Sequence, residues 1–275
     1  MIKYAIGILA SSLSIGAIAD QSKFKTADDL FSSREGSIEN TQAARAAYLE
    51  VAKNVTGADL VRAVVGAART IIYEGEALTG MIEKADVERR KSIFRECFDE
   101  VTPLINKKVL GYDSPAYYYF SAACMGYYAQ VSSTLENLRN IKRLNDTLKA
   151  GYATQGGDIY EGGGLKRVHA ALKSNPKAKP LPGGFYNPEA GLQLINESLA
   201  SEAYPGNHKG EMFCENSRRK VDVLIELKQI EVARNFGATA VEEFEFLLDL
   251  EEIPAHLTSE TKHCVSKMKE KIESL

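Results

Sequence analysis

Apolar residues recur at three- and four-residue steps along most of this chain, the period of an α-helix that is packed on one face. Between residues 58 and 76 the stripe consists of Leu60, Val64, Ala67, Ala68 and Ile71. Similar stripes occur in segments 86–105, 136–150, 188–203 and 259–274. No segment shows convincing alternation of apolar and polar residues with a period of two. The pattern therefore predicts an all-α fold without a sheet.

The segment from Ser114 to Leu135 contains no charged residue. Its start, Ser114 followed by Pro115, is typical of a helix N-terminus, because proline lacks only an N–H that would be unpaired there. The segment carries five tyrosines and several serines, which makes it a poor membrane span. We expect a helix buried on several sides, and no transmembrane span in the mature chain.

The helical segments alternate regularly. Those that start near 58, 114, 164 and 211 each precede a second segment, which starts near 86, 136, 188 and 238. We interpret residues 211–236 as one long helix that Gly237 interrupts, and 241–250 as a further helix. This order predicts antiparallel helix pairs, stacked over residues 40–275 as an irregular tetratricopeptide-like array in a single domain. An irregular helical bundle is the alternative.

Residues 1–19 have the pattern of a signal peptide. Lys3 precedes an apolar stretch, and Ala17-Ile18-Ala19 forms a small-residue cleavage signal before Asp20. The alternative is an N-terminal anchor that is never cut. We expect cleavage after Ala19, and a loose arm over residues 20–39, where the pattern is polar and weak.

Four cysteines are present: Cys97, Cys124, Cys214 and Cys264. An even number in an exported protein permits two disulfides. Cys97 and Cys124 lie in segments that look like adjacent helices, so we favour that pair, and Cys214–Cys264 follows by elimination. Four buried free thiols are the alternative. No C-x-x-C motif is present, and His263-Cys264 has no partners at ligand spacing, so no metal site is expected.

The charges exclude some functions. The formal net charge is −3 and no basic stripe runs along the chain, so no nucleic-acid partner is expected. We interpret the clusters Arg89–Lys91 and Arg218–Lys220 as solvated helix faces. The four histidines are scattered without a nearby acid or nucleophile, so neither an enzyme nor a cofactor is expected. The loop Glu161–Gly164 is either a flexible turn or a set of backbone donors for an anion.

Tyrosines supply the most specific hypothesis about a site. A tyrosine combines a large apolar body with a hydroxyl that needs a partner. On the first helix of a pair they could line a concave groove, together with polar residues from the helix that begins near 214. The candidate groove residues are Tyr117, Tyr118, Tyr119, Tyr127, Tyr128, Glu215, Asn216 and Arg219. The alternative is that the tyrosines are core residues and that the polar residues cap or solubilise their helix.

Several segments resemble the periplasmic T-component proteins of tripartite ATP-independent (TRAP) transporters. The resemblance is carried by the aromatic segment 114–129, the glycine loop 156–164, the helix start Asn187–Ala190 and the segment Cys214–Lys220. It implies an irregular tetratricopeptide-like protein of the periplasm. It also implies a solute-binding protein as partner and a cleft for a small, apolar ligand.

Two classes of function follow. The first is a periplasmic binding or adaptor protein that associates with a solute-binding protein and holds or passes a small ligand. The second is a structural, envelope-associated helical scaffold without a ligand. An internal cavity would favour the first class, and a filled core would favour the second.

Overall fold

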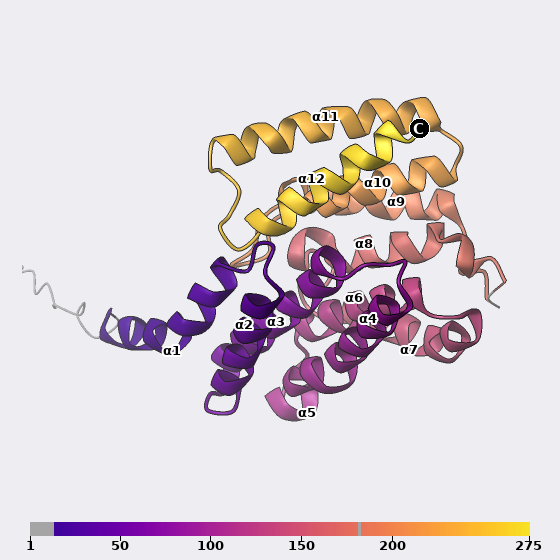
Figure 1. Cartoon of the computed structure of the whole chain (residues 1–275). Coiled ribbons are helices and arrows are strands. Elements are labelled where there is room, and N and C mark those ends of the chain that lie inside the picture. The colour runs from indigo at the N-terminus through magenta and orange to yellow at the C-terminus, as the bar shows by residue number, and fades with distance from the viewer. Residues whose placement is uncertain (1–13, 181–182) are drawn as a thin grey trace, which may run out of the picture.

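The computed structural model describes the backbone of residues 14–180 and 183–275, and the side chains of residues 22–180 and 183–275. Over this part the chain is helical and contains no strand, so the predicted all-α fold is confirmed (Figure 1). Most of the predicted signal peptide, residues 1–13, lies outside the described residues. That peptide and its cleavage after Ala19 stay predictions.

Twelve α-helices are found in the described residues, joined by short turns of other helical types (Figure 1). The α-helices are α1 (Ser14–Ser32), α2 (Ile38–Ala52), α3 (Gly57–Tyr73), α4 (Lys84–Glu96), α5 (Lys107–Leu110), α6 (Pro115–Val131), α7 (Thr134–Ala153), α8 (Tyr160–Ser174), α9 (Pro188–Leu199), α10 (Cys214–Glu226), α11 (Ile230–Asp249) and α12 (Thr258–Glu273). The turns are the π-helices η1 (Glu74–Leu78) and η2 (Cys97–Val101) and the 3₁₀-helices η3 (Thr102–Ile105), η4 (Pro176–Ala178) and η5 (Gly210–Met212).

Helices that follow one another in the chain pack side by side. This holds for α1 with α2, α2 with α3, α6 with α7, α8 with α9, α10 with α11 and α11 with α12. The predicted pairing of segments 58–76 and 86–105 is different, because α3 packs mainly on α2 and α4 packs mainly on α6. A tetratricopeptide-like stacking of these pairs stays a prediction.

The buried apolar side chains form two clusters. The larger cluster draws on α1 to α8 and includes Phe24, Phe94 and Leu165. The smaller one belongs to α10, α11 and α12 and includes Phe244 and Met268. In Figure 1 the helices of the smaller cluster lie along one side of the larger group. The candidate site lies where the two groups of helices meet.

Residues 20–39, for which the sequence predicts a loose arm, lie in α1, in the turn of residues 33–37 and at the start of α2. Phe24, Ala27 and Phe31 recur at three- and four-residue steps and are at most 5 % exposed. They pack into the larger cluster, where they bury apolar surface and hold α1 against α2. This apolar stripe was missed in the sequence because polar residues surround it.

The predicted helix 211–236 is wrong in its boundaries. The chain breaks after α10, where Lys228 has a left-handed φ of 63°, and α11 then continues through Gly237. A Cβ at Gly237 would lie 2.6 Å from Cγ2 of Ile272 and 3.1 Å from Cγ2 of Val221. This glycine therefore permits close helix packing and does not end a helix.

Both favoured disulfides are present. Cys97–Cys124 joins η2 to α6, and Cys214–Cys264 joins α10 to α12. The alternative of four free thiols does not hold. Disulfides persist in oxidising compartments, so the two bonds support export.

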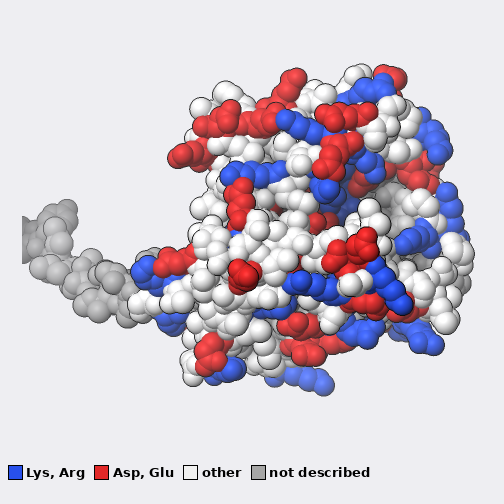
Figure 2. All heavy atoms as spheres, viewed as in Figure 1, with Lys and Arg blue, Asp and Glu red and all other residues white. Residues whose placement is uncertain are grey.

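On the face drawn in Figure 2, acidic and basic side chains alternate, and no large patch of one sign is visible. Within residues 14–180 and 183–275, none of the helices has the length and apolar character that crossing a bilayer requires.

Candidate functional site: a charged cavity between the two groups of helices

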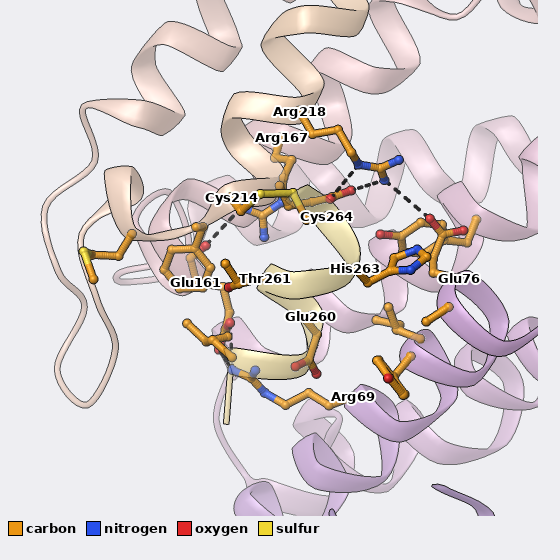
Figure 3. A pocket seen from close by; sticks show the side chains of 18 of the residues that line it. Arg69, Glu76, Glu161, Arg167, Cys214, Arg218, Glu260, Thr261, His263 and Cys264 are labelled. Carbon is orange, nitrogen blue, oxygen red and sulfur yellow. Dashed lines mark hydrogen bonds and ion pairs between the residues drawn. A yellow bond between two sulfur atoms is a disulfide. The ribbon is translucent and has the colours of Figure 1, made fainter. Parts of the chain in front are cut away.

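A cavity of about 120 Å³ lies between the helices of the two clusters (Figure 3). One side is formed by α3, η1 and α6, and the other by α8, α10 and α12. Much of its wall is apolar, with Ile72, Phe120, Met212 and Leu257 contributing side chains. The Cys214–Cys264 disulfide lies in the wall and ties α10 to α12 there. The cavity is therefore built by segments from both ends of the chain.

The π-helical turn η1 shapes one wall of the cavity. It follows α3 directly and turns Glu76 and Ala77 toward the cavity. A single π turn inside a helix rotates the residues that follow it, and such turns are frequent at functional sites. Glu76 forms ion pairs with the buried Arg90, at 2.5 Å, and with Arg218 of α10, at 3.4 Å. This carboxylate thus links the two sides.

The other carboxylates of the cavity are also paired. Arg69 places Nη2 at 2.7 Å and 2.8 Å from the two carboxylate oxygens of Glu161. Arg218 donates through Nε to Glu215 at 2.8 Å. The labelled side chains in Figure 3 show Arg69 and Arg218 on different sides of α12, which carries Glu260 between them.

Burial and charge act against each other in these carboxyl groups. Burial alone would raise the pKa of Glu215, but the charges of Arg218 and Arg219 outweigh it and hold this pKa far below its usual range. In Glu260 burial is the larger effect, and its pKa is raised although Arg34 and Arg69 lower it. Burial also lowers the pKa of His263, so the imidazole in this wall is neutral at pH 7.

The start of α8 is an unusual left-handed turn. Glu161, Gly162 and Gly163 have φ values of 52°, 57° and 74°. A Cβ at Gly162 would lie 2.3 Å from Phe213 and one at Gly163 2.6 Å from Ser201, so only glycine fits. Glu161 is the non-glycine residue of the turn. The strain of its conformation is held in place by the pair with Arg69.

Asn216 organises the polar groups behind this turn. Its side chain is fully buried and donates to the backbone oxygens of Gly162, at 2.9 Å, and Gly210, at 2.8 Å. Its Oδ1 accepts from Arg167 at 2.7 Å and from Ser198 at 2.8 Å. The left-handed turn leaves carbonyl groups without helical partners, and Asn216 satisfies one of them. The network thereby fixes α8, α9 and α10 relative to one another.

A groove of about 350 Å³ adjoins the cavity between α6, α8 and α10. Gly126 and Ala171 line it and leave space because they are small. Four residues line both the cavity and the groove, and so form the wall between them: Tyr119, Tyr127, Arg167 and Glu215.

No protein-family model matches this chain, and no curated protein matches it. The resemblance to the TRAP T-component proteins therefore stays a prediction.

The structure brings together four of the predicted groove residues. Tyr119, Tyr127 and Glu215 lie in the shared wall, and Arg219 lines the groove. Tyr119 accepts a hydrogen bond from Arg167 at 2.8 Å, and Tyr127 stacks on Phe94. Tyr127 is strongly desolvated, and burial raises its pKa.

The remaining predicted residues lie elsewhere. Tyr117 and Tyr118 line a different surface cleft, between α6 and α7, where Tyr118 donates to Asp113 at 2.7 Å. Tyr128 is 2 % exposed, and its hydroxyl accepts from the exposed Arg95. Asn216 is a core residue. Successive helical residues point in different directions, so one run of tyrosines cannot line a single groove.

Sequence reasoning missed most of the charged residues of the cavity. Arg218 and Arg219 were expected on a solvated face, yet their side chains are only 18 % and 14 % exposed, and Arg90 of the other basic cluster is buried. The turn Glu161–Gly164 is also buried, so it is not a flexible surface turn. A usable signal was Glu161 directly before three glycines.

Proposed function

We propose that this chain is a helical binding protein that holds a small organic molecule in the cavity between its two groups of helices. The observation that carries this proposal is a cavity whose walls combine apolar side chains with converging charged groups. Binding sites for small molecules have this composition: apolar walls bury most of the ligand and a few polar groups orient it.

The compartment and the partner protein are proposed from the sequence. The signal-peptide pattern and the resemblance to the TRAP T-component proteins favour the periplasm, with a solute-binding protein as partner. The two disulfides support an oxidising compartment of this kind. In this role the protein would hold or pass a ligand beside that partner.

Filling the cavity tests the proposal. Ala77 lines the cavity, so Ala77→Leu would occupy space that the ligand needs. Ala46→Leu makes the same change on an exposed position of α2 and is the matched control. We expect small aromatic and branched aliphatic compounds to raise the melting temperature of the wild type and of Ala46→Leu, and not that of Ala77→Leu. Equal behaviour of the three proteins would contradict the cavity as a site.

The partner needs a separate experiment. The protein, carrying a photo-crosslinking residue near the groove, is recovered from the envelope of its native host, and its crosslinked partner is identified by mass spectrometry. A solute-binding protein as the main product supports the adaptor role. Another class of protein as the main product would contradict it.

One observation favours the second candidate, a structural scaffold without a ligand. Every carboxylate of the cavity is already paired with an arginine of the chain, so no ligand is needed to neutralise the charges of these carboxylates. A scaffold predicts that Ala77→Leu stabilises the fold by filling space, and that none of the compounds shifts the wild-type melting temperature.

A further inference from the structure

Arg167 occupies a distinctive place in the wall between the cavity and the groove. Its side chain lines both spaces, while the residue as a whole is 5 % exposed. It comes from the first regular turns of α8, directly after the left-handed turn that Asn216 holds. The position is therefore rigid and open to both spaces.

The hydrogen bonds of Arg167 use only some of the N–H donors of its guanidinium. Nη1 donates to Asn216 at 2.7 Å and to the backbone oxygen of Glu161 at 3.3 Å, and Nη2 donates to Tyr119 at 2.8 Å. A guanidinium has five N–H donors. The Nε–H and one Nη2–H make no hydrogen bond within the described residues. Two donors on adjacent nitrogens match the two oxygens of a carboxylate.

Arg167 also lacks a direct ion pair, although the charge of Glu215 in the same wall acts on it. Each carboxylate of the cavity has an arginine partner: Glu76, Glu161 and Glu215 as described above, and Glu260 through Arg34. Among the described residues that line the cavity, Arg69 and Arg218 have carboxylate partners, whereas Arg167 forms no ion pair. A carboxylate in direct contact would lower the cost of burying this charge further. Its three partners inside the fold are all neutral.

The volume of the cavity limits the size of the ligand's apolar part. A cavity of about 120 Å³ is close to the engineered apolar cavity of about 150 Å³ that binds benzene. It has room for one aromatic ring or a short branched aliphatic group, against Phe120 and Leu257. The groove, at about 350 Å³, lies on the other side of the shared wall and is also lined by Arg167, so a ligand can approach Arg167 through it.

We propose that the ligand of this site is a small organic anion, an aromatic or branched aliphatic carboxylate, whose apolar part fills the cavity and whose carboxylate is held by Arg167. This inference rests on the proposed binding function and names the class of its ligand. Tyr119 and Asn216 keep the guanidinium in place, and so act as positioning residues.

Matched probes with negative, neutral and positive head groups on similar apolar parts test the inference. Isothermal titration calorimetry compares benzoate with benzamide and benzylamine, and isovalerate with isovaleramide and isoamylamine. We expect the carboxylates to bind at least about tenfold more tightly than the amides, because hydrogen bonds between charged groups are roughly twice as strong as neutral ones. We expect the amines to bind most weakly.

Variants of Arg167 test whether this residue causes the preference for carboxylates. Arg167→Gln is expected to remove the advantage of the carboxylates, and Arg167→Lys, which keeps the charge but not the paired donors, to retain part of it. Arg139→Gln changes the net charge equally at an exposed position and is expected to bind as the wild type does. Circular dichroism melts establish that each variant is folded.

Gly126→Leu covers the case in which Arg167→Gln does not fold. A Cβ at Gly126 meets only Val168, at 3.6 Å, so a larger side chain there extends toward the groove without touching the Arg167 network. It is expected to weaken carboxylate binding roughly tenfold or more by blocking the approach through the groove. Unchanged carboxylate binding by this variant and by Arg167→Lys would overturn the assignment to Arg167.

The outcomes separate this inference from the proposed function. If carboxylates, amides and amines bind equally well, or the amines bind best, the binding function stands and the inference is overturned. If no probe of either series binds at millimolar concentration, both are overturned.

Discussion

Arg34, in the turn between α1 and α2, forms a partly buried ion pair with Glu260 of α12, so this turn is joined directly to the last α-helix that the structure describes. The Arg34 side chain is 1 % exposed, and its Nη2 also donates to the backbone oxygen of His256 at 3.2 Å. Its guanidinium lies 3.6 Å from the centre of the Phe31 ring. This contact holds the end of the chain against its beginning beside the cavity.

Removing Arg34 should destabilise the protein. Arg34→Met leaves the Glu260 carboxylate without its partner, and we expect a loss of about 3 kcal/mol in the free energy of unfolding. Arg34→Met combined with Glu260→Met should cost clearly less, because no charge is left unpaired. Urea denaturation of the wild type, both single variants and the double variant measures the coupling. A loss below about 0.5 kcal/mol for Arg34→Met would contradict a structural role for the pair.

Alanine substitutions at two glycines distinguish the cost of backbone strain from the cost of a steric clash. Gly36 has a φ of +70° with nothing near its Cβ position, whereas Gly162 has a φ of +57° with Phe213 at 2.3 Å. Gly36→Ala should cost roughly 1 kcal/mol from the left-handed conformation alone. Gly162→Ala should cost at least about 3 kcal/mol, since Phe213 must also move. Thermal melts compare the two, and equal losses would show that the packing around the turn of α8 is looser than described.

Stability should fall on acidification below neutral pH. Burial lowers the pKa of His256 to about 3 and that of His169 to about 4, from an ordinary value of 6.5. At pH 7 both are neutral in the folded and unfolded states. Below pH 6.5 the unfolded chain binds protons that the folded chain does not, so stability that is present above pH 6.5 is lost as the pH falls toward 4.

The expected loss is roughly 1 kcal/mol per histidine and pH unit, less than the 1.4 kcal/mol of a fully desolvated group because both side chains are partly exposed. Urea denaturation between pH 7 and pH 5 measures it. His256→Gln and His169→Gln should each make the free energy of unfolding depend less on pH. The double variant should show the weakest dependence. A wild-type profile that does not change over this range would count against the burial of both rings.

The sequence alone determined the fold class and correctly favoured the two disulfides, while the structure excluded four free thiols. Apolar stripes such as Leu60, Val64 and Ile71 predicted helices because a helix buries residues three and four positions apart. The pair Cys97–Cys124 could be inferred because neighbouring helical segments tend to pack together. The stripe Phe24, Ala27 and Phe31 was missed, since polar residues surround it. Gly237 was misread because a helix terminator and a packing glycine look the same in one sequence.

Only the tertiary structure decided which residues share the candidate site. Arg69, Glu161, Arg167 and Arg218 come from three helices that are far apart in the chain. A charged residue on a helix looks solvated in the sequence, whether it faces water or a partner on another helix. Its environment is set by long-range packing, which joins α3, α8 and α10 around one cavity, and no local pattern records that arrangement.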